Sequence, residues 1–252
     1  MDQARVDQKV KVDRKIKKEE GGLWETIKVV LQALLIALVV RTVLFQPFNI
    51  PSGSMMATLL IGDYLFVSKY SYGYSRYSFP FYPPPFTGRI IGSGPERGDV
   101  VVFRLPRDDS TDYIKRVIGL PGDRIMVRDG VLIINGTPVG RQKVGAEDPE
   151  APGGTIYIET LPNGIDHRIR EVSDDEFGDH TREYVVPPGH YFVMGDNRDN
   201  SQDSRFIGPI PAENLVGRAE ILFFSVDGSA ALWEVWRWPT AIRWRRLFNP
   251  VE

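Results

Sequence analysis

The sequence has no cysteine among its 252 residues and only three histidines, at positions 167, 180 and 190. The absence of cysteine excludes disulfides, cysteine-zinc sites and thiol catalysis. The 31 Lys and Arg nearly balance the 33 Asp and Glu, for a formal net charge of −2. The chain therefore lacks the excess of basic charge that would point to a nucleic-acid partner. We expect no metal, no cofactor and no nucleic acid.

A basic arm opens the chain and occupies residues 1–25. The first 20 residues hold seven Lys and Arg against five acidic residues. No apolar face develops among them, so we expect a solvated, poorly ordered arm.

An apolar segment follows at residues 26–45, TIKVVLQALLIALVVRTVLF, in which only Lys28 and Arg41 are charged. Twenty residues is about the length of a membrane-spanning helix, and cationic side chains near its ends can reach the headgroups. Lys and Arg are abundant before this segment and absent between Thr42 and Ser68. This asymmetry predicts a cytoplasmic N-terminus and a large domain on the outer side of the membrane.

The length and the flanks of this segment bear on two other interpretations. Its uninterrupted centre, 29–40, is short and contains Gln32, so a helix buried in a globular domain stays open. A cleavable signal peptide is disfavoured, because Gln-Pro-Phe-Asn-Ile-Pro follows without a small-x-small cleavage site.

Short β-branched or alternating runs dominate the rest of the chain. Pro-Gly, Asp-Gly and Asn-Gly pairs separate them, a pattern typical of an all-β sandwich or barrel. Asn135-Gly136 between two apolar runs predicts a tight hairpin. The expected strands are 64–67, 99–103, 113–118, 124–127, 131–134, 155–158, 184–186, 191–193 and 219–226.

Two segments differ in composition from these strands. Residues 147–183 hold eleven acidic residues and three Arg, and we expect a solvated surface insertion. Residues 72–86 hold seven aromatic residues and four prolines, which excludes a central strand. This segment is either a hairpin packed on itself or an exposed apolar lip that touches membrane.

Nucleophilic catalysis in this chain would require Ser or Thr with a Lys or carboxylate base. Beyond the apolar segment the only lysines are Lys69, Lys115 and Lys143. Lys115 lies inside the apolar run Asp-Tyr-Ile-Lys-Arg-Val-Ile-Gly, where loss of hydration would lower its pKa. Neighbours on a strand face opposite ways, so either Lys115 or Arg116 must point inward.

Two loops carry hydroxyl and charged side chains. In Ile-Pro-Ser-Gly-Ser-Met-Met, Pro51 and Gly53 fix an unusual turn from which Ser52 and Ser54 can project side by side. Residues 195–205, Gly-Asp-Asn-Arg-Asp-Asn-Ser-Gln-Asp-Ser-Arg, fail as an EF-hand loop because the required Gly and Glu are absent. They are either a solvated surface loop or a catalytic loop braced by Asp/Arg pairs.

Four motifs in this order resemble the bacterial type I signal peptidases, the leader peptidases of the Ser/Lys dyad class. They are Pro-Ser-Gly-Ser-Met-Met-x-Thr-Leu (51–59), Arg-Gly-Asp-Val-Val-Val-Phe (97–103), Tyr-Ile-Lys-Arg-x-x-Gly-Leu-Pro-Gly-Asp (113–123) and the 195–205 loop. Leu-Val-Gly-Arg-Ala at 215–219 matches as well. The resemblance covers roughly residues 44–126 and 187–248.

The resemblance implies a role for each matching position. Ser54 is expected to be the nucleophile and Lys115 the general base, with Ser201 orienting the Lys115 amine. The Ser52 hydroxyl and the Ser54 N–H are expected to form the oxyanion hole. Ion pairs of Asp203 with Arg205 and of Asp196 with Arg116 would brace the loop. The positions implied for shallow substrate pockets are Ile50, Met55, Leu59, Tyr113 and Ile114.

The resemblance also implies the fold and the activity. We expect a mainly β protein with a single transmembrane helix, an antiparallel β-sheet catalytic domain (46–126 and 187–248) and an inserted smaller β-rich, acidic domain (127–186). It would remove signal peptides from exported preproteins after small residues of the Ala-x-Ala type, through an acyl-enzyme. Its partners would be those signal peptides, the lipid bilayer of the bacterial inner membrane and, by proximity, the secretion translocon.

The sequence departs from the pattern of the family at two points. Ala57 stands where the family often has Pro, and the chain has one anchor where some members have two.

Two rival functions remain open at this point. A self-cleaving repressor-type protease would share the dyad and the β fold but would need a DNA-binding domain. A membrane-anchored β-rich binding module would have no catalysis at all.

Overall fold

The structure is a computed structural model that describes residues 22–79, 87–145, 153–230 and 233–252. The chain divides into two compact units, Met1–Arg41 and Thr42–Glu252. Residues 1–21, most of the predicted basic arm, lie outside the described part.

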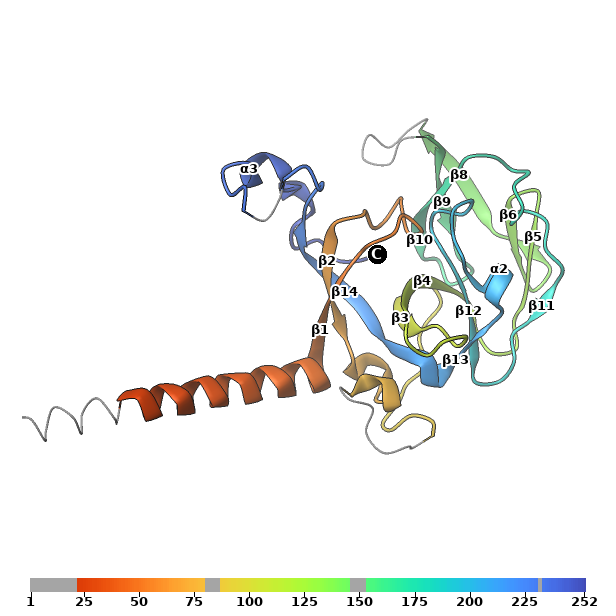
Figure 1. Cartoon of the computed structure of the whole chain (residues 1–252). Coiled ribbons are helices and arrows are strands. Elements are labelled where there is room, and N and C mark those ends of the chain that lie inside the picture. Colours follow the sequence, from red (N-terminus) through yellow and green to blue (C-terminus); the bar gives the residue numbers. More distant parts are fainter. Residues whose placement is uncertain (1–21, 80–86, 146–152, 231–232) are drawn as a thin grey trace, which may run out of the picture. The chain divides into compact units, whose positions relative to one another are not determined.

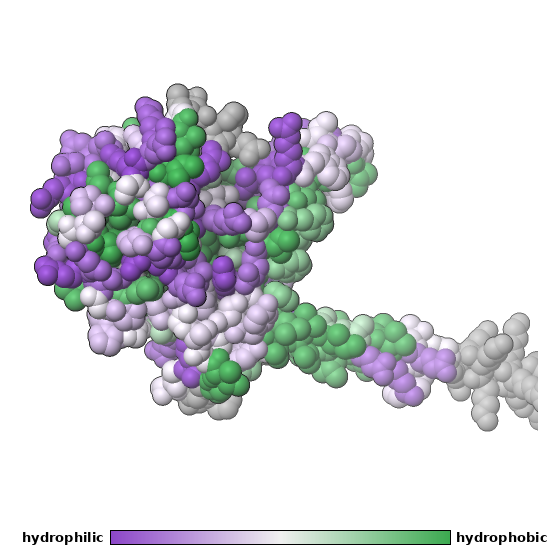
Figure 2. Space-filling model, turned by 180° about the vertical axis from the view of Figure 1, so that it is seen from behind, coloured by the Kyte–Doolittle hydropathy of each residue, from purple (hydrophilic) through white to green (hydrophobic). Residues whose placement is uncertain are grey.

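A helix spans Gly22–Leu44, and its last five residues form the π-helical turn η1 (Val40–Leu44). Within the described ranges it is the one helix long and apolar enough to cross a membrane by length and composition. Its leucines and valines are exposed, and Figure 2 shows apolar side chains along most of its described length. The predicted segment 26–45 overlaps this helix, which begins earlier, at Gly22, and ends before Phe45, the first residue of the first strand.

One antiparallel sheet of seven strands carries the larger unit, in the order β1-β2-β14-β3-β4-β12-β13. Figure 1 shows the long β14 beside β2 and β3. β1 is an edge strand, which tolerates its Pro47. The bounds are β1 (Phe45–Asn49), β2 (Asp63–Ser68), β3 (Val100–Arg104), β4 (Asp112–Gly119), β12 (His190–Met194), β13 (Ile210–Pro211) and β14 (Leu215–Ser225).

Two smaller antiparallel sheets and several short helices complete this unit. The first sheet, β11-β5-β6-β7, contains β5 (Arg124–Arg128), β6 (Val131–Ile134), β7 (Thr137–Pro138) and β11 (Tyr184–Val185). The second, β10-β9-β8, contains β8 (Gly140–Gly145), β9 (Thr155–Thr160) and β10 (Asp166–Glu171). The short helices are η2 (Tyr70–Tyr72), η3 (Arg76–Ser78), α2 (Ser204–Ile207), η4 (Ala212–Asn214), α3 (Trp238–Ala241) and η5 (Trp244–Arg246).

The prediction of a mainly β, antiparallel fold is confirmed, and each of the nine expected strands overlaps an observed one. The hairpin at Asn135-Gly136 joins β6 to β7, and both turn residues have the positive φ, 54° and 81°, that this turn requires. The predicted domain boundary at residue 126 falls inside β5. The division of residues 46–252 into a catalytic core and an insert remains a prediction.

The large sheet is buried on both faces around β3. Val100 and Val102 belong to one apolar cluster, whereas Val101 and Phe103 belong to another. Since alternate side chains of a strand face opposite ways, this split explains why β3 is apolar without interruption. Strand β4 pairs with β3 and carries Lys115 beside this core.

For the described residues, the structure corrects one expectation about composition and excludes one of two alternatives for another segment. Within 153–183, Glu159, His167 and Glu171 are buried, although a solvated insertion was expected. Glu159 is held in an ion pair with Arg198, and Glu171 lies against Arg141 while burial raises the pKa of its carboxyl to about 8. Tyr72 and Tyr77 are also buried and donate their hydroxyls to Asp99 and Asp109, so this part is no apolar lip. Residues 80–86 lie outside the described part.

Candidate active site

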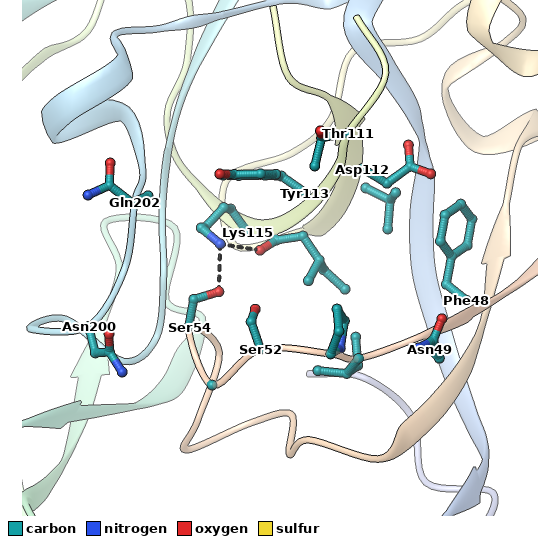
Figure 3. A pocket seen from close by; sticks show the side chains of 15 residues that line it. Phe48, Asn49, Ser52, Ser54, Thr111, Asp112, Tyr113, Lys115, Asn200 and Gln202 are labelled. Atoms are coloured by element: carbon teal, nitrogen blue, oxygen red, sulfur yellow. Dashed lines mark hydrogen bonds between the residues drawn. The ribbon is translucent and has the colours of Figure 1, made fainter. Parts of the chain in front are cut away.

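Lys115, in the middle of β4, reaches Ser54 in the turn between β1 and β2. Its Nζ lies 2.7 Å from Ser54 Oγ and donates to the carbonyl of Ile114 at 2.8 Å (Figure 3). The Lys115 residue is 3% exposed, and Nζ lies 5.2 Å from the centre of the Tyr113 ring. A hydroxyl and an amine are thus within the hydrogen-bond reach that a nucleophile and its base require.

Burial lowers the pKa of Lys115 from 10.5 to about 8. The cause is the loss of hydration of the ammonium form, and the negative charges of Asp203 and Asp196 act in the opposite direction. With this pKa, about one molecule in ten has a neutral amine at pH 7. That neutral form is the one able to accept a proton from a serine hydroxyl.

Both adjacent cations of β4 are buried, where at least one was expected to point inward. Arg116 is 1% exposed. Lys115 is also not the only buried lysine among the described residues, because Lys69 is 3% exposed. Lys69 Nζ donates to the carbonyl of Ser78 at 2.6 Å. Burial alone therefore does not distinguish Lys115, but its contact with Ser54 does.

Asn197 holds the turn that carries Ser54. Its backbone N–H donates to the Ser54 carbonyl at 3.1 Å, and its Nδ2 donates to the Gly53 carbonyl at 2.8 Å. Asn197 is fully buried, and its Oδ1 accepts from Arg170 at 3.0 Å. Sequence analysis missed this residue, because nothing in a polar loop indicates which amide turns inward.

Arg116 and Asp196 form a buried ion pair directly behind the dyad. Two hydrogen bonds of 2.9 and 2.7 Å join the guanidinium to the carboxylate, and each side chain is 1% exposed. The hydroxyl of Thr58 also donates to Asp196, at 2.6 Å. The residue after Lys115 is thereby linked to the 195–205 loop and to the turn after Ser54.

Asp203 orders the second half of the same loop. It accepts two hydrogen bonds of 2.9 Å from the Arg205 guanidinium and one of 3.0 Å from the N–H of Gly195. Its side chain also caps α2 through the N–H of Arg205. A side chain at Gly195 would clash, because its Cβ would lie 2.3 Å from Ser201 Oγ and 2.4 Å from the Ser54 carbonyl oxygen.

Ser201 lies beside this turn but does not contact Lys115 as predicted. Its Oγ is buried and makes no hydrogen bond within the described residues. The nearby hydroxyl is one of the groups that lower the pKa of the Asp203 carboxyl. The two hydrogen bonds found for Lys115 Nζ go to Ser54 and Ile114 instead. The orienting role of Ser201 stays a prediction.

A cavity of about 580 Å³ opens beside the dyad, between the segment 48–54 and the segment 111–115. Ile50, Tyr113 and Ile114 line it as predicted. Met55 and Leu59 instead lie fully buried in the apolar cluster that contains Ile50, and they do not line it. Figure 3 shows the Ser52 and Ser54 hydroxyls on the same side of their turn.

A buried charge cluster joins the second small sheet to the 195–205 loop. Arg198 donates to both oxygens of Glu159, one at 2.8 Å, and His167 Nε2 lies 3.3 Å from the same carboxylate. The N–H of Arg170 donates to the carbonyl of Asp196 at 2.8 Å. No sequence signal indicates an ion pair between residues 39 positions apart.

In the described ranges, no group of three or more His, Cys, Asp or Glu is arranged to hold a metal ion.

Comparison with known proteins shows the family of the chain. Residues 23–224 match the family model described as signal peptidase, peptidase S26. The chain belongs to this signal peptidase family. It is 47% identical over 203 residues to the signal peptidase I of Rickettsia canadensis (strain McKiel), covering 75% of this chain and 76% of that protein. It is 44% identical over 223 residues to that of Rickettsia conorii (strain ATCC VR-613 / Malish 7), covering 84% and 81%.

A crystal structure of a signal peptidase I from Enterococcus faecalis V583 is 28% identical and covers 50% of this chain and 97% of that one, with a TM-score of 0.33. Membership in the signal peptidase family establishes the coarse activity: the chain is a serine peptidase, a hydrolase that removes signal peptides. Both rival functions, the self-cleaving repressor and the non-catalytic binding module, are thereby excluded.

Proposed function

We propose that this signal peptidase cuts exported preproteins after small residues by means of a Ser54/Lys115 dyad. The observation that carries the proposal is the 2.7 Å separation of Ser54 Oγ from a buried amine whose pKa is about 8. In the acylation step the neutral amine takes the Ser54 proton while Oγ bonds to the scissile carbonyl carbon. The ammonium then protonates the leaving amine as the peptide bond breaks, which leaves an ester on Ser54.

Water completes the cycle. Lys115 accepts a proton from the water that attacks the ester and then passes it to Ser54 Oγ as the acid product leaves. The Ser52 hydroxyl and the Ser54 N–H are assigned to the developing oxyanion. The pairs Arg116–Asp196 and Asp203–Arg205 are assigned to holding this geometry, and Ser201 to orienting the amine.

Specificity for small residues is assigned to the apolar side of the cavity. Ile50, Ile114 and Val102 line it there, and branched apolar side chains of this kind suit the small apolar side chains of Ala. Met55 and Leu59 are assigned to the layer that supports Ile50, since they lie in the same cluster.

The bilayer is the second proposed partner. The length and apolar composition of the helix Gly22–Leu44 support a single anchor in the bacterial inner membrane. The Lys and Arg asymmetry places the N-terminus in the cytoplasm and the catalytic unit outside, near the secretion translocon.

Cleavage of a purified preprotein tests the proposed function. The full-length protein in lipid vesicles should cut a preprotein after its Ala-x-Ala site, as N-terminal sequencing of the product would establish. The same preprotein with Phe in place of the last Ala should stay intact. Equal cleavage of both would contradict the proposed specificity.

A further inference from the structure

The dyad lies between two ends of the cavity that differ in their lining. The end toward β1 and β3 presents the apolar side chains of Phe48, Ile50 and Val102, with the polar Asn49 and Asp112 beside them. The other end presents two carboxamides, Asn200 and Gln202. Figure 3 shows Asn200 and Gln202 on one side of Ser54 and Lys115, and Phe48 with Asn49 on the other.

Asn200 and Gln202 are exposed because the loop alternates. Ser201 and Asp203 point inward and are buried, so the side chains between them face solvent at the cavity. Neither carboxamide has a hydrogen-bond partner in the parts of the chain that the structure describes. The loop that carries them is fixed by Asp203–Arg205 and by the Asn200 N–H, which donates to the Asn197 carbonyl at 3.1 Å.

We propose that Asn200 and Gln202 bind the backbone of the residues that follow the cut, a role that rests on the proposed function. If small residues before the cut occupy the apolar end, the chain after the cut must leave Ser54 over the amide end. A carboxamide both donates and accepts, as an extended peptide backbone does. Being uncharged, these side chains would hold the backbone of mature N-termini of either charge.

Two substrates that differ only after the cut separate this role from catalysis. The first is an Ala-x-Ala peptide with a 4-nitrophenyl ester at the cleavage position, which has no residue beyond it. The second is the same peptide continued by five residues. Asn200→Ala/Gln202→Ala in the full-length protein should lower kcat/KM for the continued peptide about three- to tenfold, the worth of one or two hydrogen bonds. It should leave ester hydrolysis unchanged.

Asn49→Ala is the matched control, since Asn49 is an exposed amide that lines the same cavity at its other end. It should change the rates for both substrates by the same factor. The inference is overturned if the double variant affects both substrates equally or affects neither. A wild-type protein that cleaves neither substrate would instead refute the proposed function, and the inference with it.

Discussion

Arg116 donates two hydrogen bonds to Asp196, and both side chains are almost completely buried. This pair fastens the strand that carries Lys115 to the loop whose Asn197 holds the Ser54 turn. The dyad distance therefore depends on a contact that touches neither catalytic group.

Asp196→Asn should destabilise the protein by about 3–5 kcal/mol, because it leaves Arg116 buried without its counter-charge. Thermal unfolding of the purified protein measures this loss. Asp175→Asn is the control, since the carboxylate of Asp175 is exposed and pairs with the exposed His180, and it should change stability by less than about 0.5 kcal/mol. Equal stability of Asp196→Asn and wild type would contradict a structural role for the pair.

Activity should rise as the pH increases through 8. Only the neutral amine of Lys115 serves as base, and with a pKa of about 8 its fraction grows roughly tenfold between pH 7 and pH 9. The pH profile of kcat/KM measures this directly. His180→Gln/His190→Gln should leave the profile unchanged; a profile that moved with these histidines would assign the base elsewhere. His167 is unsuitable for this control because it lies buried against Glu159.

Lys115→Met should be more stable than wild type at pH 7, by about 1–3 kcal/mol. Folding buries an ammonium whose pKa falls from 10.5 to about 8, and this cost disappears with the charge. Between these two pH values the unfolded wild type binds more protons than the folded form, so wild-type stability rises with pH there.

The advantage of Lys115→Met should accordingly shrink between pH 8 and pH 10.5, which chemical unfolding at several pH values would measure. Lys143→Met provides the comparison, because Lys143 is an exposed lysine in β8. If Lys115→Met were less stable than wild type at pH 7, burial of the Lys115 amine would not lower the free energy of unfolding.

A C-terminal aromatic surface, formed by Trp233, Trp236, Trp244 and Phe248, should bind anionic membranes. These residues are 61–77% exposed, and indole favours the membrane interface. Thr42–Glu252 is a compact unit, so a fragment with these bounds should sediment with anionic vesicles and shift its Trp emission to the blue.

Replacing Trp233, Trp236 and Trp244 with Ser should abolish this sedimentation, whereas Phe177→Ser, at another exposed ring, should not. Arginine variants are a poorer test, because Arg246 and Arg243 are ion-paired with the buried Asp63. Absence of binding by the unaltered fragment at low salt would leave the helix as the only proposed membrane contact.

Local patterns in the sequence were enough to predict the strands and the hairpin. Period-two runs such as β6 and turn pairs such as Asn135-Gly136 depend on neighbouring residues alone. Among the missed strands, β8 and β10 are rich in polar residues. Beside Ile169, β10 buries His167 and Glu171, which lie in pairs with Glu159 and Arg141. Such pairs join distant positions, as Glu159 and Arg198 do, so composition suggested solvent exposure instead.

The candidate site was predictable in its parts but not in its contacts. The motifs marked Ser54 and Lys115, yet only the fold brings a turn and a strand 61 positions apart to 2.7 Å. The same holds for Asn197, whose inward amide fixes the turn. Ser201 shows the reverse, since its motif was recognised but its predicted contact with Lys115 is not formed among the described residues.

The most direct test of the account is the rate of preprotein cleavage by Ser54→Ala, Lys115→Ala and the double variant, each with its fold verified by circular dichroism. Groups that act as one catalytic unit are not additive, so each single variant should lose essentially all activity and the double variant should be no worse. Substantial turnover by folded Lys115→Ala would contradict the assignment of Lys115 as the base that activates Ser54.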